Sequence, residues 1–368
     1  DAGRPVPASA AHLDRSLPWV PSLDITLAFR MDALAAFMSL IVLGVGALVL
    51  AYCARYFREH EAKDTVFGGQ LLAFAGAMFG LVTTDDLMVL YTFWEVTSVL
   101  SFLLIGYSGH RIFARRSAIT ALIVTTVGGL AMLAGLIMLA HMAGSWRISG
   151  VLAAAPGLLA DDGGRVLLEV AVGLVLIGAL TKSAQAPFHF WLPGAMAAPT
   201  PVSAYLHAAA MVKAGVYLVA VLAPSFADVP FWRPAVLLLG TATMLVGGWR
   251  ALRQTDLKLL LAYDTVSQLG FMVLLALINL RGVGESVKAN VVLTLVELSG
   301  LLLIIFIGLY AVTQGKADFS RAMVFESPSD KSTFIAISMA TALAFFAMVG
   351  FEDSVNMAEE TKDPTRTF

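Results

Sequence analysis

Residues 31–54 read MDALAAFMSLIVLGVGALVLAYCA, and Asp32 is the only charged residue among them. A run of about 20 predominantly apolar residues is long enough to cross the hydrocarbon core of a bilayer as a helix. Stretches of the same character recur along the rest of the chain. This pattern predicts a multi-pass protein whose first partner is the lipid bilayer.

About ten candidate spans satisfy the same length and polarity criteria. They cover residues 31–54, 66–83, 86–107, 117–142, 166–184, 202–223, 234–249, 258–278, 290–312 and 333–352. In hydrocarbon each backbone polar group needs a partner within the protein, so only helices and closed barrels can span the bilayer. The length of the runs and their lack of strict alternation favour helices. We therefore expect an all-α, polytopic transmembrane helical bundle.

The composition excludes several classes of function. Hydrophobic residues make up 58% of the chain and charged residues 14%, and the mean hydropathy is +0.81, whereas soluble domains contain about 25% charged residues. The net charge of −2 indicates no nucleic-acid partner. A single cysteine, Cys53, excludes an intrachain disulfide and a cysteine-based metal site. No dinucleotide, haem, iron–sulfur or zinc pattern occurs, so we expect no metal, no cofactor and a transporter instead of an enzyme.

Basic residues orient the predicted spans. Loops that carry an excess of Lys and Arg lie on the cytoplasmic side, and such loops follow the first, third and seventh predicted spans, which all fall on one side. Their basic residues are Arg55, Arg58, Lys63, Arg111, Arg115, Arg116, Arg250, Arg253 and Lys258. The Pro-rich residues 1–30 then form an extramembrane lead-in on the outer side, not a cleavable signal. We expect a multi-pass protein of the plasma membrane, specifically a bacterial inner membrane.

Three ionisable residues interrupt apolar spans: Glu95, Lys182 and Lys213. A charge at the bilayer centre costs about 2.5–3.5 kcal/mol on insertion scales and persists only with a partner or a water-filled path. A structural ion pair or a lysine that reaches the interface explains one such residue. Three of them together favour a relay that moves protons along the middle of the membrane.

Four further residues are candidates for the same relay. His207 and His189 lie close in sequence to the two lysines, and an imidazole titrates near neutral pH, although a membrane histidine can also be a structural hydrogen-bonding residue. Lys258 begins the eighth predicted span, where a boundary residue reaching the interface is an alternative. Asp264 lies within about two turns of the same end, so an exposed interface carboxylate explains it as well.

Residues 185–201 contain four prolines, Pro187, Pro193, Pro199 and Pro201. Each removes a backbone donor and clashes with the preceding turn of a helix, so this segment must be broken. Broken helices beside charged residues recur at the ion sites of transporters. The alternative is an ordinary cytoplasmic loop.

Residues 180–193 (LTKSAQAPFHFWLP) and 198–208 (APTPVSAYLHA) resemble the A-type subunit of Mrp-type monovalent cation/proton antiporters. This family is related to the antiporter-like membrane subunits of respiratory complex I. Shorter matches follow in the family's order over about residues 17–275: WVPSL at 19–23, FWE at 93–95, DLK at 256–258, AY at 262–263 and SQLG at 267–270. The resemblance implies an antiporter domain at 31–275 that is truncated relative to the family.

The resemblance also implies roles for the ionisable residues. Glu95 and Lys182 would form a charge pair whose making and breaking gates a half-channel, and Lys213 with His207 would pass protons laterally. Asp264 departs from the family pattern, which puts its role in doubt. The implied partners are protons, monovalent cations and the other Mrp-type subunits. A proton-pumping membrane subunit of an NADH:quinone oxidoreductase is the related alternative.

A second resemblance concerns residues 276–368. The segments FFAMVGFE at 345–352 and AEETKDPTR at 358–366 resemble permeases of the amino acid/polyamine/organocation superfamily. This resemblance implies a substrate site at Gly350 and Phe351, although helix packing also explains the glycine. We therefore expect a chimera, joined within residues 274–278, and an amino-acid permease fragment is a further alternative function.

Overall fold

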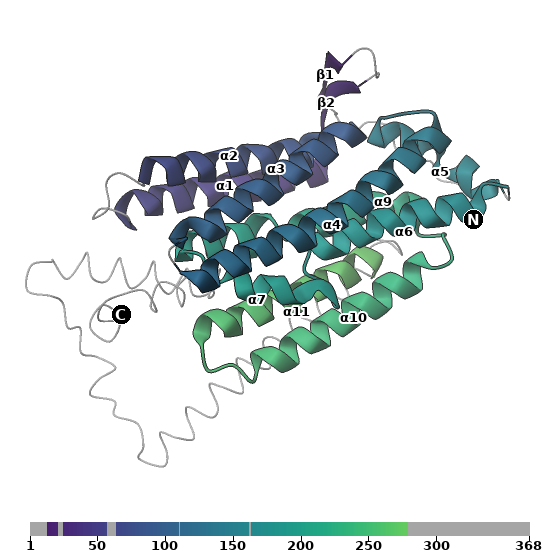
Figure 1. Cartoon of the computed structure of the whole chain (residues 1–368). Helices are drawn as coiled ribbons and strands as arrows, with labels where there is room; N and C mark the ends of the chain where they lie inside the picture. The colour runs from purple at the N-terminus through teal and green to yellow at the C-terminus, as the bar shows by residue number, and fades with distance from the viewer. Residues whose placement is uncertain (1–12, 21–24, 57–63, 110, 162, 279–368) are drawn as a thin grey trace, which may run out of the picture.

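The computed structural model describes residues 13–20, 25–56, 64–109, 111–161 and 163–278. Long helices lie roughly alongside one another, with a β-hairpin at one end of the bundle (Figure 1). The strands are β1 (Leu13–Val20) and β2 (Ile25–Met31), and the long helices are α1 (Ala33–Tyr56), α2 (Asp64–Thr83), α3 (Leu87–Ile105), α4 (Ile112–Ala143), α6 (Arg165–Lys182), α9 (Lys213–Phe226), α10 (Trp232–Ala251) and α11 (Leu257–Ile278).

The first eight predicted spans all correspond to helical segments. By length and composition, α1, α2, α3, α4 and α11 could each cross a membrane. The predicted helical membrane bundle is therefore confirmed in kind. The ninth and tenth predicted spans, 290–312 and 333–352, lie outside the described residues, so the total of ten spans stays a prediction.

The sixth predicted span is not one regular α-helix. It begins as a single turn, α8 (Thr200–Val202), continues as a π-helical segment, η4 (Ser203–Ala210), and becomes α-helical only from Lys213 onward. A π-helical turn spaces its hydrogen bonds one residue wider than an α-helix and is frequent at functional sites. The predicted span over 202–223 is therefore helical, but it changes helix type along its length.

Two further elements were not predicted. Helix α5 (Ile148–Ala160) is only 13 residues long, too short for a criterion of about 20 apolar residues. The hairpin lies largely in the expected lead-in, and its strands pair antiparallel with Leu13 opposite Met31. A hydropathy search for spans finds neither element, because both are too short to cross a bilayer as a helix.

Small residues let α4 and α6 approach closely. A Cβ atom on Gly178 would lie 2.5 Å from Cβ of Met132 and 2.8 Å from the carbonyl oxygen of Gly128. Glycine at such positions permits backbone-to-backbone packing, the main source of association between helices in lipid. The same device joins α10 and α11, where Gly270 would meet the backbone of Met244.

Large apolar side chains on the outside of the bundle face away from the core. Exposed members include Leu40, Leu72, Val127, Leu130, Leu238 and Leu245. Exposed apolar area on this scale is unfavourable in water and requires an apolar surrounding. The outer surface of the helices therefore fits the hydrocarbon of a bilayer.

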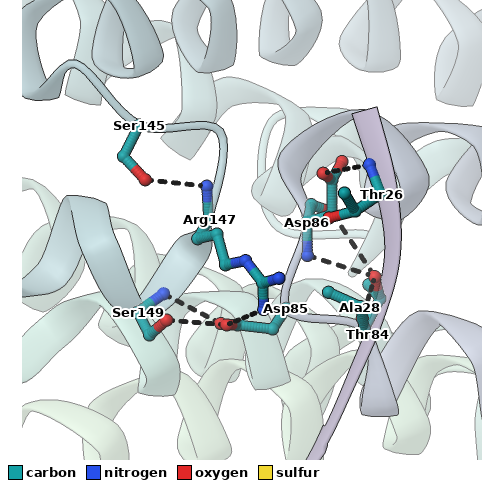
Figure 2. A network of polar contacts seen from close by, with 8 residues as sticks. All are labelled: Thr26, Ala28, Thr84, Asp85, Asp86, Ser145, Arg147 and Ser149. Carbon is teal, nitrogen blue, oxygen red and sulfur yellow. Dashed lines mark hydrogen bonds and ion pairs between the residues drawn. The ribbon is translucent and has the colours of Figure 1, made fainter. Parts of the chain in front are cut away.

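Asp86 and Asp85 tie the hairpin, α3 and α5 together at one end of the bundle (Figure 2). Asp86 caps α3: its Oδ1 accepts from the N–H groups of Met88 and Val89 at 2.9 and 3.1 Å, and its Oδ2 accepts from Thr26 N–H at 3.3 Å. Asp85 accepts from the N–H and the hydroxyl of Ser149 at 2.8 and 2.6 Å. These two carboxylates fix where α3 begins.

Replacing Asp86 with Ala is expected to lower the thermal stability of the detergent-solubilised protein, because two N–H groups of α3 and one of the hairpin lose their acceptor. Loss of a helix N-cap typically costs about 1 kcal/mol. Asp86→Asn keeps an acceptor oxygen and serves as the matched control, with a smaller shift in Tm. Equal Tm values for wild type and Asp86→Ala would contradict the capping role.

Candidate functional site

Lys182 is the last residue of α6 and is fully buried. Its Nζ donates to the carbonyl oxygen of Trp94 at 2.7 Å, to Thr97 Oγ1 at 2.6 Å and to Ser98 Oγ at 3.1 Å. A lysine ammonium has three donors, so each of its protons has an acceptor on α3. The ammonium also lies 4.6 Å from the centroid of the Trp94 ring, within the range of a cation–π contact.

The two hydroxyl groups are oriented to accept. Thr97 Oγ1 and Ser98 Oγ both donate their own protons to the Trp94 carbonyl oxygen, at 2.8 and 3.1 Å. Their lone pairs therefore point away from that carbonyl and are available to Lys182. Neutral dipoles of one helical turn, not a carboxylate, solvate the buried cation.

Glu95 lies on the same turn of α3 and is half-buried. Its Oε2 accepts from Thr126 Oγ1 on α4 at 3.3 Å, and its Oε1 is buried without a hydrogen-bond partner. Within the described ranges no ion pair joins Glu95 to Lys182. Glu95 and the groups that bind Lys182 thus lie on one turn of α3, but the two members of the predicted charge pair are not in direct contact.

Consecutive glycines on α4 make room for this arrangement. A Cβ on Gly129 would collide with Glu95 Oε1, and a Cβ on Gly128 would collide with Oγ1 of Thr181. Because Thr181 precedes Lys182, the two glycines let α4 pack closely against both the Glu95 side chain and the end of α6 that carries Lys182. Thr126 lies less than one turn away and supplies the hydrogen bond.

His207 is fully buried in the π-helical segment, and neither of its ring nitrogens has a hydrogen-bond partner in the described protein. Its ring lies edge-on to that of Trp191, with centroids 6.1 Å apart. Trp191 Nε1 in turn donates to the carbonyl oxygen of Thr181 at 3.0 Å. Trp191 therefore connects the end of α6 that carries Lys182 with His207.

The Pro-rich segment is packed only partly inside the bundle. It folds as η3 (Phe188–Phe190), α7 (Trp191–Ala195) and α8, and most of α7 is buried. The N–H of Ala186 donates to Thr243 Oγ1 at 2.8 Å, and Thr243 lies in the middle of α10. The predicted break near 185–201 is thus confirmed, with Ala186 held against the middle of α10, whereas Pro187 and Phe190 are exposed on the outside of the bundle.

The other candidate residues are more scattered. Lys213 is half-buried at the first position of α9, six residues after His207. His189 is half-buried in η3, with a buried Nδ1 that has no hydrogen-bond partner. Lys258 and Asp264 are half-buried in the first two turns of α11. Gly350 and Phe351 lie outside the described residues.

Several residues of the site were not predicted: Trp94, Thr97, Ser98, Thr126 and Trp191. A signal for some of them is present in the sequence, because Thr97, Ser98 and Ser101 recur at helical spacing within an apolar span. Backbone acceptors such as the Trp94 carbonyl leave no such signal.

Comparison with known proteins decides the family. The family described as "NADH:quinone oxidoreductase/Mrp antiporter, TM" matches residues 84–342, and "NADH-Ubiquinone oxidoreductase (complex I), chain 5 N-terminus" matches residues 18–67. The chain belongs to the NADH:quinone oxidoreductase/Mrp antiporter family of membrane subunits. The resemblance inferred from the motifs around Lys182 is thereby confirmed.

Individual relatives in this family are named as antiporter subunits. The A/B-type subunit of a probable K(+)/H(+) antiporter of Rhizobium meliloti (strain 1021) is 46% identical over 271 residues, which cover 74% of this chain and 27% of that protein. The A-type subunit of the Na(+)/H(+) antiporter of Alkalihalophilus pseudofirmus is 43% identical, over 77% of this chain and 35% of that protein. The chain therefore spans about a quarter to a third of the length of these relatives.

A solved structure supports the fold. A chain of the Mrp complex from Dietzia sp. DQ12-45-1b superposes with a TM-score of 0.69 at 40% identity, covering 74% of this chain and 29% of that one. The named relatives are antiporter subunits, and the solved relative is a chain of an Mrp complex.

The comparisons give no support to the predicted permease segment. The family match extends to residue 342 and so continues past the expected junction within 274–278. The residues after 278, including the motifs that suggested a permease, lie outside the described residues. The motifs at 345–352 and 358–366 lie beyond the end of this match, so the permease resemblance stays a prediction without support.

Replacing Thr97 with Val is expected to destabilise the protein, because a proton of the buried Lys182 ammonium loses its acceptor while the side-chain shape is kept. An unsatisfied buried group of this kind costs about 1–3 kcal/mol. The measurement is thermal unfolding in detergent. Thr92→Val on the same helix is the control, since Thr92 is exposed and its hydroxyl bonds only to its own helix at Met88 O. Equal Tm shifts in the two variants would rule out a special role for Thr97.

Proposed function

We propose that this chain is part of the membrane subunit of a monovalent cation/proton antiporter in a bacterial plasma membrane, where it moves protons through a relay centred on Lys182. The observation that carries the proposal is a fully buried lysine held by three neutral acceptors. A buried amine surrounded by dipoles can exist charged or neutral and so can take up and release a proton. The motif resemblance and the antiporter relatives support the same conclusion.

Glu95 controls the occupancy of Lys182 in this proposal. A carboxylate on the same turn favours the ammonium electrostatically, and protonation of the carboxylate removes that preference. The two groups therefore titrate as a coupled pair. Movement of Glu95 toward or away from Lys182 changes which of them holds the proton.

A path from Lys182 toward His207 follows buried polar atoms. Ser183 Oγ, Ser203 Oγ and both His207 nitrogens are buried without a hydrogen-bond partner in the described protein. Buried polar groups normally have partners, and water supplies them where protein does not. We infer that water connects these atoms and passes the proton from Lys182 to His207 and on to Lys213. His189, Lys258 and Asp264 are further proposed members of the path, nearer the inner end of the bundle.

The other subunits of an Mrp-type complex are the proposed partners, and a proton and a monovalent cation are the proposed substrates. A proton-pumping subunit of an NADH:quinone oxidoreductase is the second candidate, favoured by the family description that names both classes. Exchange driven by a cation gradient without NADH supports the antiporter, whereas transport that requires NADH oxidation supports the alternative.

Replacing Lys182 with Ala is expected to abolish cation/proton exchange, because the buried proton carrier is removed. The measurement is exchange after a pH jump in vesicles that contain the intact complex. Lys182→Met, which keeps the length of the side chain, tests the role where the Ala variant fails to assemble. Arg165→Ala at the exposed start of the same helix is the control with unchanged exchange. Wild-type exchange in both Lys182 variants would refute the relay.

Gly129→Ala is expected to slow exchange by about tenfold, equivalent to about 1.4 kcal/mol, because the added methyl group displaces the Glu95 carboxylate from Thr126. Gly76→Ala on α2 is the control, since its Cβ would meet no atom within 4 Å. The same pH-jump assay compares the two variants. If both behave as wild type, the position of Glu95 does not govern transport.

A further inference from the structure

A cavity of about 110 Å³ lies at the hairpin end of the bundle, apart from the Lys182 site. Polar and charged groups gather around it from the end of β2, the turn between α2 and α3, the start of α5 and the middle of α9. The polar and charged lining residues are Arg30, Asp32, Thr84, Asp85, Ser149 and Tyr217. The network of Figure 2 forms one side of this cavity through Asp85 and Ser149. A polar cavity of this size holds water.

Helix α9 forms the wall of the cavity that leads toward the relay. Tyr217, Leu218 and Val221 line the cavity. Lys213 precedes Tyr217 by four residues, so the two share a helix face and lie about 6 Å apart along the axis. The face of α9 that borders the cavity therefore continues directly to the proposed relay lysine.

The Tyr217 side chain forms part of the cavity wall, about one turn of α9 from Lys213. It is half-buried, and its hydroxyl donates to the carbonyl oxygen of Val82 in the last turn of α2 at 2.7 Å. This hydrogen bond joins α9 to the last turn of α2, beside the cavity.

Charged side chains of both signs surround the cavity. Two carboxylates, Asp32 and Asp85, face one guanidinium, Arg30, among its lining residues. Asp32 also caps α1 through Ala35 N–H at 2.8 Å, and Asp85 is held by Ser149 and by Arg147 Nη1 at 3.9 Å. With Arg30 and Arg147, these groups form two guanidiniums and two carboxylates, so the cavity is polar without an excess of either charge.

We propose that this cavity is a water-filled inlet by which protons from the outer face reach Lys213, and that Tyr217 is its inner closure. The excess of basic residues in the loops at the opposite end places the hairpin end outside. This inference rests on the proposed function, because it supplies the relay with its outer access. Water in the cavity carries the proton, and opening of the contact between Tyr217 and Val82 joins that water to Lys213.

Cysteine accessibility tests the inlet. Cys53 is the only cysteine in the sequence, so Cys53→Ala provides a cysteine-free chain within the intact complex. Val221→Cys is then treated with a membrane-impermeant cationic thiosulfonate from the outer side of right-side-out vesicles. We expect it to react and to lose exchange after modification. Val219→Cys, on the same turn of α9 but 2% exposed and outside the cavity lining, is the matched control that does not react.

A second pair of variants tests the closure. Lys213→Cys is expected to react from the outer side in the Tyr217→Ala background and to remain unreactive where Tyr217 is intact. Failure of Val221→Cys to react, reaction from the inner side only, or reaction without loss of exchange would each overturn the inlet. Exchange that survives Lys182→Ala would instead refute the relay and leave the labelling pattern unchanged, so the two proposals fail separately.

Discussion

The arrangement of the site depends on solvation of one ammonium group inside the helix bundle. Lys182 is fully buried, and its three protons are accepted by the Trp94 carbonyl, Thr97 and Ser98. A buried charge without such acceptors would be strongly destabilising. The need for these acceptors holds α6 against α3. Glycines on α4 then let α4 approach both helices.

The break after Lys182 is the second consequence of the same constraint. Because α6 ends at the lysine, its last carbonyl groups need partners inside the bundle. Trp191 Nε1 satisfies the carbonyl of Thr181, and Thr243 accepts the N–H of Ala186. The Pro-rich segment thus supplies polar partners to a helix end and at the same time places an aromatic ring between that end and His207.

Hydropathy predicted the eight described spans because apolar length alone determines which segments cross a bilayer. It missed α5, which is short, and the hairpin, which lies outside the apolar runs. Ionisable residues in apolar surroundings likewise drew attention to Lys182, Glu95 and His207, whose functional roles stay predictions. Sequence could not show that Lys182 binds hydroxyl and carbonyl groups in place of Glu95, since that choice depends on how α3 and α6 are rotated against each other. It also could not reveal the cavity, whose lining comes from β2, α2, α3, α5 and α9.

The position of Lys182 has an electrical consequence. Its acceptor Trp94 lies about 10 Å along α3 from the outer end of that helix, well inside the hydrocarbon layer. A proton that reaches Lys182 from either face therefore crosses part of the transmembrane voltage, and a full crossing is worth about 2.3 kcal/mol per charge at 100 mV. The neutral acceptors around Lys182 do not cancel this work. In the proposed relay the membrane potential thus enters the protonation equilibrium of Lys182 directly, so an energised membrane would bias its occupancy even at equal pH on both sides.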